Sequence, residues 1–316
     1  MLYEASAPGS VMLLGEHAVL HGYSAVVCAV NRRISVKLKP RDDDKIHIFS
    51  EALGECVTDI KTLSLINKKF QFVLVAINQF KEQLACGFDL HIVSEFSAKV
   101  GLGSSAAVTV ATLAVLQKWL DNKLNLNKLY EEGLVVVRNV QQRLGSGADV
   151  AASVFGGVLH YQIKPAKIIK LNYFPKISLV YTGYKTPTVE VIKKVQEGQA
   201  KDPEYFAGLF KLMGECTELG VKCIKRKDLI VLGDVFALHQ EAQEKLGVSD
   251  KVINEIIVKA NKLPGLNGAK ISGAGLGDCI VVLGELPKNY FPEDAKQKGG
   301  IRQIEVEIEK DGVELS

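Results

Sequence analysis

A glycine-rich turn that runs directly into a long apolar helix is the strongest constraint on how this chain can fold. The turn lies in Lys99–Val108, and the alternating segment Phe88–Phe96 before it predicts a strand. The alanine-rich segment Ala106–Leu116 after it predicts a buried helix. Gly101 and Gly103 can adopt positive φ, which lets backbone amides converge beside the unpaired amides of the helix start. This strand–turn–helix unit favours an anion-binding site, most often one for phosphate.

Other interpretations of this turn stay open at the level of the sequence. Glycines followed by Ser104 and Ser105 can form a plain turn with a helix cap. The P-loop pattern is excluded, because neither Gly-Lys-Ser nor Gly-Lys-Thr occurs in the chain. The dinucleotide fingerprint matches Gly101, Gly103 and Ala106, and Asp121 lies at the expected spacing, but this match alone is weak. The turn therefore predicts a phosphate ligand without specifying which one.

Composition narrows the classes of protein that this chain can belong to. The 316 residues suffice for two domains or one large one, with a globular balance of 47% hydrophobic and 24% charged residues. A net charge of +3 from scattered basic residues argues against nucleic acid as the main partner. The six cysteines show no C-x-x-C spacing, which favours reduced thiols. No signal peptide or apolar run of about 18 residues is found, so we expect a cytoplasmic protein without a membrane partner. We expect it to be a monomer or a homodimer.

The N-terminal segment predicts a small, mostly antiparallel sheet. In Ala5–Gly22 a Pro-Gly turn precedes a short apolar strand and a polar Gly-Glu-His break. Further strands are expected at Ser24–Val30 and Arg33–Lys39, the second with one wet face. Glu16 and His17 are either turn residues or a buried carboxylate and imidazole beside a cleft.

Helices and a second glycine-flanked acid follow. Ile60–Leu84 and Leu124–Arg143 are predicted to be helical. Asp149 follows a glycine turn at the start of an apolar helix. It is either a first-turn charge that favours the helix dipole or, given the small residues around it, part of a ligand site.

Pro165 marks the expected domain boundary, which divides the chain into residues 1–164 and 165–316. In the second half His239 is a lone imidazole on a predicted helix, and a structural role is expected for it. The Gly268–Leu283 segment predicts a strand, a second glycine-rich turn and another strand, which could also be a simple hairpin. The remaining predicted elements are a strand at Ile177–Gly183, helices at Thr186–Val195 and within Tyr205–Leu263, and a strand at Gly300–Glu309.

Three segments, taken in order, resemble the family of small-molecule kinases that includes galactokinase, homoserine kinase, mevalonate kinase and phosphomevalonate kinase. They are Ala7–Gly22, Gly101–Ala107 and Lys270–Cys279, and the resemblance covers nearly the whole chain. It implies an α+β fold of two domains with the active site in the cleft between them. The N-terminal domain, which binds ATP, would resemble a ribosomal small-subunit protein, and the C-terminal domain would be a ferredoxin-like α/β sandwich.

The resemblance also implies roles for individual residues. Asp149 would be the catalytic aspartate, which accepts the proton of the substrate hydroxyl or orients that hydroxyl. Ser105 would ligate Mg²⁺ between the β- and γ-phosphates of ATP. The ATP phosphates would be bound by Gly101, Leu102, Gly103, Ser104, Ser105 and Ala106. The substrate would be bound by Glu16, His17, Ala18, Val19, Thr188, Ser272, Gly273, Ala274 and Gly275.

Three residues depart from the family pattern. Ser10 stands where the mevalonate-pathway members usually have a lysine that pairs with the aspartate, and a serine cannot supply that charge. Lys99 is the predicted catalytic replacement and Lys185 the reserve. Arg138 stands in place of the acidic magnesium ligand of mevalonate kinases, so no acidic metal ligand is assigned. Ser97 replaces a frequent proline before the phosphate turn.

The acceptor is expected to be a small hydroxy acid. Gly15–Gly22 and Leu246–Ser249 resemble the mevalonate members, whereas Gly145–Ser153, Lys99 and the Gly-Asp-Cys ending at Cys279 resemble the phosphomevalonate members. We therefore expect ATP- and Mg²⁺-dependent phosphorylation of the primary hydroxyl of mevalonate, with phosphomevalonate as the alternative. A degenerate member that binds nucleotide or metabolite without turnover is a further hypothesis, motivated by Ser10.

Overall fold

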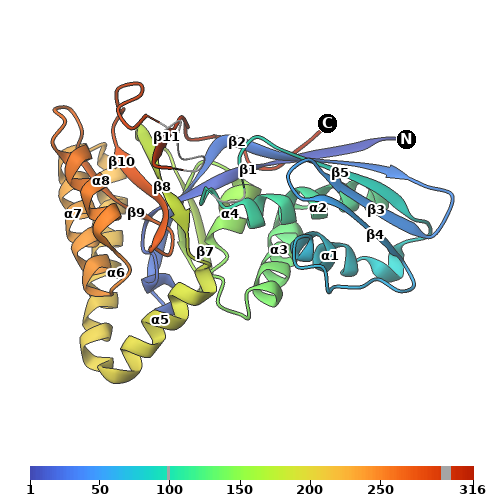
Figure 1. Cartoon of the computed structure of the whole chain (residues 1–316), viewed down its shortest axis with the longest axis horizontal. Coiled ribbons are helices and arrows are strands. Elements are labelled where there is room, and N and C mark those ends of the chain that lie inside the picture. Colours follow the sequence, from blue (N-terminus) through green and yellow to red (C-terminus); the bar gives the residue numbers. More distant parts are fainter. Residues whose placement is uncertain (98–99, 293–299) are drawn as a thin grey trace.

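Two β-sheets with helices packed against them form the framework of the protein, which confirms the α+β class (Figure 1). The structure is a computed structural model and describes residues 1–97, 100–292 and 300–316. The first sheet has the order β12-β1-β2-β5-β3-β4, with β6 also paired to β2 and β7 to β6. The second has the order β11-β8-β10-β9.

The strands and helices have the following bounds. The strands are β1 (Tyr3–Leu14), β2 (Ser24–Pro40), β3 (Lys45–Ser50), β4 (Gly54–Asp59), β5 (Phe88–Ser94), β6 (Val158–Gln162), β7 (Lys167–Leu171), β8 (Ile177–Lys185), β9 (Gly268–Ser272), β10 (Gly277–Leu283), β11 (Arg302–Ile304) and β12 (Glu314–Leu315). The helices are α1 (Gln71–Asn78), α2 (Ser104–Asp121), α3 (Leu126–Val140), α4 (Ala148–Phe155), α5 (Thr188–Lys201), α6 (Pro203–Arg226), α7 (Leu229–Lys245) and α8 (Lys251–Asn261), with short 3₁₀ turns η1 (Ala18–His21) and η2 (Lys81–Gln83).

The first sheet is built on the long antiparallel pair β1 and β2, as the sequence predicted. The expectation of two separate strands at Ser24–Val30 and Arg33–Lys39 was wrong, because β2 runs through both. Pro8 of β1 pairs with Arg33 of β2, and the next residue of β1, Gly9, pairs with Val30 of β2. The two residues between, at 31 and 32, form a bulge that bends the strand without ending it.

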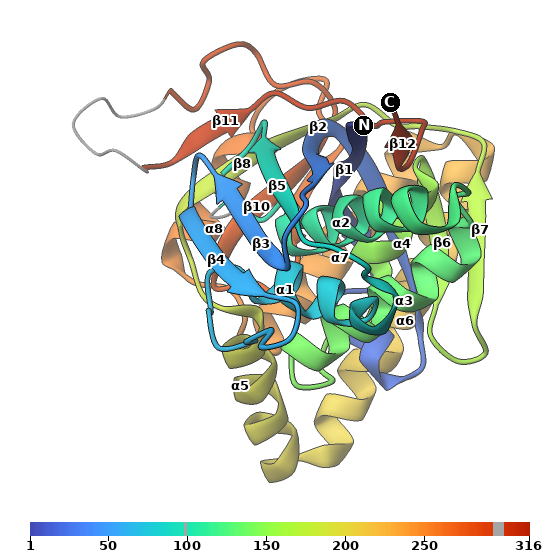
Figure 2. The same cartoon turned by 90° about the vertical axis from the view of Figure 1, so that its right-hand side faces the viewer.

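Helix α2 is the central helix of the N-terminal half. It packs on β1 and β2 and contacts α1, α3 and α4 (Figure 2). Its many alanine, valine and threonine side chains allow close approach of neighbours on most sides, as the sequence predicted.

The predicted helix over Ile60–Leu84 was wrong over most of its length, because only α1 and η2 are helical there. The predicted helix Leu124–Arg143 is confirmed as α3, whose start is capped by Asn125 accepting a hydrogen bond from the amide of Lys128.

The second sheet is covered on both faces. Along β10, Cys279, Val281 and Leu283 join the core of the first sheet, whereas Ile280 and Val282 pack with α5, α6 and α8. This alternation is the two-residue period of a strand. Both halves of the chain therefore share a continuous core, which holds the two sheets in a defined relation.

The predicted strand–turn–strand at Gly268–Leu283 is confirmed as β9 and β10. The predicted last strand is reduced to β11 and an isolated bridge between Val30 and Ile308.

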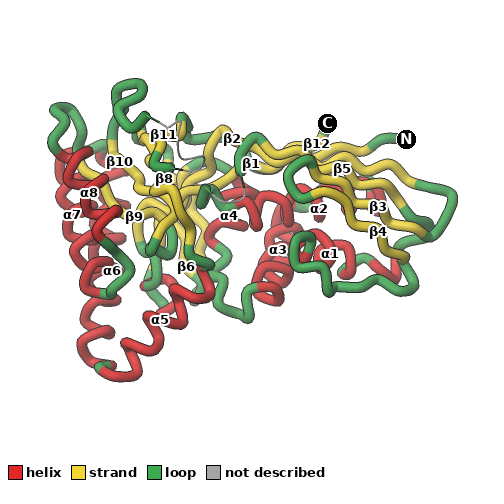
Figure 3. Tube along the Cα trace, in the orientation of Figure 1, coloured by secondary structure: helices red, strands yellow, loops and turns green. Residues whose placement is uncertain are grey.

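The chain returns to the first sheet at its C-terminus. Strand β12 pairs with β1, and the two termini lie close together (Figures 1 and 3). The first sheet also continues past Pro165, because β7 pairs with β6. The predicted division into residues 1–164 and 165–316 remains a prediction. No helix within the described residues is long and apolar enough to cross a membrane.

Candidate active site

A cleft open to solvent, with a cavity volume of about 150 Å³, lies where the glycine turn before α2, the start of α4 and the β9–β10 turn meet. Most of the predicted site residues line it, namely Glu16, His17, Val19, Gly101, Gly103, Ser104, Ser105, Ala106, Asp149, Thr188, Ser272, Gly273 and Ala274. Three predicted residues do not line it: Leu102 and Ala18 are buried in the core, and Gly275 packs against Val248. Lys99 lies outside the described residues.

The glycine turn has the geometry of an anion cradle. Gly101 and Gly103 have φ of 66° and 61°, a region that favours glycine. The amide of Ser10 donates to the carbonyl of Leu102 at 3.0 Å, which ties the turn to β1. At the start of α2 the amides of Ser104 and Ser105 make no hydrogen bond to the described part of the chain. These unpaired donors fit a phosphate group.

Gly103 provides a test of this cradle. A Cβ at this position would lie 2.0 Å from Oγ of Ser10. An alanine here would also have to adopt the positive φ of Gly103, which costs a residue with a Cβ about 1–2 kcal/mol. We expect Gly103→Ala to displace the turn and to weaken ATP binding at least tenfold in calorimetric titration. Gly54→Ala is the control, because Gly54 also has positive φ but its Cβ would meet open space. Equal ATP affinity of the two variants would contradict the cradle.

Asp149 lies in the first turn of α4 and faces the cleft. Its Oδ1 accepts a hydrogen bond from Oγ of Ser10 at 2.8 Å. Desolvation raises the pKa of Asp149, while the Ser10 hydrogen bond and the charge of Lys185 act in the opposite direction. A carboxylate with a raised pKa is a stronger base than an ordinary aspartate. The departure from the family at position 10 therefore leaves a hydroxyl, not a cation, in contact with Asp149.

Lys185, at the end of β8, is the cation that the structure brings to this site. Its Nζ lies 3.1 Å from Oδ1 of Asp278, and its charge lowers the pKa of both Asp278 and Asp149 against the larger raising effect of burial. Asp278 has φ of 64°, and a Cβ at Gly101 would meet its side chain at 2.9 Å. Asp278 was not among the predicted site residues, although an acid inside a glycine-rich turn could have indicated it.

The described residues contain no cluster of three or more His, Cys, Asp or Glu side chains able to hold a metal ion. Ser105 at the start of α2 and the carboxylates of Asp149 and Asp278 nevertheless share the cleft. Mg²⁺ is typically bound by one or two carboxylates together with substrate phosphates. The donor set therefore fits a magnesium ion that arrives with a nucleotide better than one bound by protein alone.

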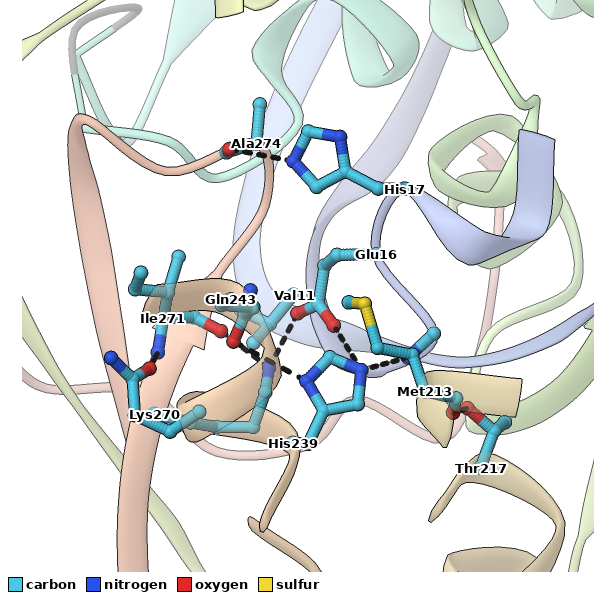
Figure 4. A network of polar contacts seen from close by, with 12 residues as sticks. Val11, Glu16, His17, Met213, Thr217, His239, Gln243, Lys270, Ile271 and Ala274 are labelled. Atoms are coloured by element: carbon cyan, nitrogen blue, oxygen red, sulfur yellow. Dashed lines mark hydrogen bonds and ion pairs between the residues drawn. The ribbon is translucent and has the colours of Figure 1, made fainter. Parts of the chain in front are cut away.

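A fully buried polar network lies beneath the cleft and joins the two halves of the chain (Figure 4). Nζ of Lys270 on β9 lies 2.6 Å from Oε1 of Glu16, which follows β1. The amide of Gly15 donates to Nε2 of His239 at 3.0 Å, so the other ring nitrogen carries the proton and donates to Gln243. Burial, together with the charge of Lys270, holds the pKa of His239 well below its usual range. Lys270 is thus the counter-ion of Glu16.

His17 makes a second connection between the halves. It has φ of 58°, and its Nε2 donates to the carbonyl of Ala274 in the β9–β10 turn at 2.8 Å (Figure 4). Desolvation lowers the pKa of His17, so its imidazole is neutral at pH 7. Of the two interpretations of Glu16 and His17, the structure shows the buried carboxylate and imidazole beside a cleft.

Comparison with known proteins places this geometry in a family. The sequence profile of the GHMP kinases N terminal domain matches residues 71–157, and the galactokinase galactose-binding signature matches residues 3–40. The mevalonate kinase of Archaeoglobus fulgidus is 32% identical over 298 residues, covering 93% of this chain and 98% of that protein. The chain belongs to the GHMP kinase family. The family membership predicted from the three motifs is therefore confirmed. As a GHMP kinase, the protein belongs to a family of small-molecule kinases that use ATP.

Solved structures agree with the fold of this GHMP kinase. The mevalonate kinase of Methanococcus jannaschii superposes with a TM-score of 0.74 at 23% identity, covering 98% of each chain. The phosphomevalonate kinase of Streptococcus pneumoniae, in complex with phosphomevalonate and AMPPNP, gives 0.73 at 17% identity, covering 98% of this chain and 99% of that one. The two-domain fold of the family is thereby confirmed. Because the two scores are nearly equal, the fold does not discriminate between the two acceptors.

Proposed function

We propose that this GHMP kinase transfers the γ-phosphoryl group of ATP to the primary hydroxyl of mevalonate. The observation that carries the reaction is Asp149, which shares one cleft with the unpaired amides at the start of α2. The choice of mevalonate is supported by the full-length similarity to the A. fulgidus mevalonate kinase. Phosphoryl transfer depends mainly on positioning and charge neutralisation, which these groups can supply.

Each part of the cleft has a role in this proposal. The turn from Gly101 to Ala106 binds the phosphates of ATP through backbone amides. Mg²⁺, when bound beside Ser105, would neutralise phosphate charge. Asp149 accepts the proton of the acceptor hydroxyl, and Ser10 holds the aspartate through Oγ. His17 and Ala274, joined by their hydrogen bond, form part of the wall against which the acceptor lies.

Lys185 supplies the cation that position 10 lacks. It lines the cleft, and its charge acts on both Asp149 and Asp278. Lys99, the first choice from the sequence, stays a prediction. We expect Lys185→Met to lower kcat about 10²-fold, the loss typical of one group that stabilises transition-state charge, with partial rescue by Lys185→Arg. Lys176→Met, at an exposed ion pair just before β8, is the control. An unchanged kcat in Lys185→Met would transfer the role to another cation.

The acceptor is tested by measuring ADP release with mevalonate and phosphomevalonate side by side. Faster turnover of mevalonate is expected. Phosphomevalonate is the second candidate, favoured by Asp278 in its Gly-Asp-Cys sequence, and faster turnover of it would replace the proposal. Ser10 favours a third candidate, a nucleotide-binding protein without turnover. Tight ATP binding with no ADP release from any tested hydroxy acid or sugar would support that candidate.

A further inference from the structure

A second hollow adjoins the cleft. It is lined by η1 and Gly22 after it, by the end of α3 and the loop that follows, and by the two residues after β6. It shares Val19, Leu20 and Gly145 with the cleft and shares no residue with the turn from Gly101 to Ala106. We call it the basic hollow, after three of its residues, Arg138, Arg143 and Lys164.

The charge of the basic hollow is not compensated. Among the described residues that line it there are three cationic side chains and no acidic one. The charged groups of Arg138, Arg143 and Lys164 make no hydrogen bond or ion pair to other described residues. Cations gathered in a concavity without counter-ions attract an anion, and guanidinium groups suit carboxylate and phosphate in particular.

The backbone around the hollow is tied in place. The amide of Arg143 donates to the carbonyl of Arg138 at 2.7 Å, which fixes the two arginines one turn apart at the end of α3. On the other side, the side-chain amide of Gln162 donates to the carbonyls of Gly22 and Lys164 at 2.9 and 3.2 Å. The three cations are therefore presented from fixed segments.

The hollow adjoins the loop that leads to Asp149, because Gly145 of that loop lines both the hollow and the cleft. The hydroxyl of Tyr161 donates to the carbonyl of Ser146, in the loop that leads to Asp149, at 2.6 Å. The pKa of Tyr161 is raised above its usual range mainly by burial, and the charges of both Arg138 and Asp149 act on it, the first lowering and the second raising it. Tyr161 is thus within electrostatic reach of both the hollow and the catalytic aspartate.

We propose that the basic hollow binds an anionic group, a carboxylate or a phosphate, of a small molecule. One source is the far end of the acceptor whose hydroxyl is phosphorylated, and the other is a free anionic effector. This proposal deepens the proposed function where the acceptor is the source.

The test uses Arg143→Gln/Lys164→Gln, which leaves the half-buried Arg138 in place. The control is Lys225→Gln/Arg226→Gln, which removes the same charge from exposed positions on α6. Calorimetric titration with inorganic pyrophosphate is done on protein whose nucleotide site is filled by a non-hydrolysable ATP analogue. We expect pyrophosphate binding to weaken at least tenfold in the first variant and to stay unchanged in the control. Equal affinity of both variants and wild type would overturn the proposal.

Kinetics identify the source of the anion. If it belongs to the acceptor, the KM for mevalonate or phosphomevalonate rises about tenfold in the variant, while kcat and the KM for ATP stay within twofold. If it is a free effector, acceptor KM is unchanged and the effect of pyrophosphate on the wild-type rate is lost in the variant. Should wild type turn over neither acceptor, the proposed function fails, and the pyrophosphate titration still decides on the hollow.

Discussion

Asp149→Asn is expected to lower kcat by about 10²–10⁴-fold, which is the range typically lost when a general base is removed. The amide is nearly isosteric with the carboxyl and can still accept the hydrogen bond from Ser10, so the packing at the start of α4 is retained. What it cannot do is accept the proton of the acceptor hydroxyl. The measurement is ADP release under saturating ATP and acceptor, together with ATP affinity by titration, which should change less than threefold.

The pH dependence gives an independent view of the same group. Because desolvation raises the pKa of Asp149, its basic form is lost on acidification at a higher pH than for an ordinary aspartate, whose pKa is about 3.9. We expect the acid limb of kcat/KM in wild type to have its midpoint above that value and to be absent in Asp149→Asn. The control is Asp234→Asn, at an exposed position on α7, which should retain wild-type kcat. Normal turnover by Asp149→Asn would remove Asp149 from the catalytic role.

Lys270→Met is expected to lower the free energy of unfolding by about 3–5 kcal/mol, because it leaves the buried carboxylate of Glu16 without its counter-ion. Both side chains are almost fully buried, so water cannot replace the lost partner. Oε2 of Glu16 already lacks a hydrogen-bond partner among the described residues, which leaves this carboxylate dependent on Lys270. Urea denaturation followed by circular dichroism measures the change.

Two controls define the interpretation of Lys270→Met. The double variant Lys270→Met/Glu16→Gln removes both charges and should recover a large part of the loss, since the cost lies in the unpaired charge. Lys176→Met breaks an exposed ion pair with Glu285 and should change stability by less than about 1 kcal/mol. If Lys270→Met were as mild as Lys176→Met, the network beneath the cleft would not be the tie between the two halves.

The elements that the sequence predicted well are those whose signals are local. The glycine turn and α2 followed from positive-φ glycines and an alanine-rich run, and the β9–β10 turn followed from glycines between two apolar segments. The predictions failed where distant pairing decides the outcome. The bulge in β2 depends on the register against Pro8 and Gly9 of β1. Likewise, the helix predicted over Ile60–Leu84 begins only at Gln71, because residues 60–70 form a loop after β4, whose first amide, that of Ile60, donates to the distant carbonyl of Asp44.

For the site, the three ordered motifs already indicated phosphate binding and the family. They could do so because turns that require positive φ need glycine, and glycines at fixed spacing are visible in the sequence. Asp149 could be singled out for the same reason. The sequence named Lys99 and Lys185 as candidate cations beside it but could not decide between them, because charges far apart in the chain meet only after folding. Lys185 reaches the cleft at the end of a strand paired with β10, and Lys270, an isolated charge within an apolar strand, becomes the partner of Glu16 across 254 positions. The chemistry was local, but the pairing of its charges depended on tertiary contacts.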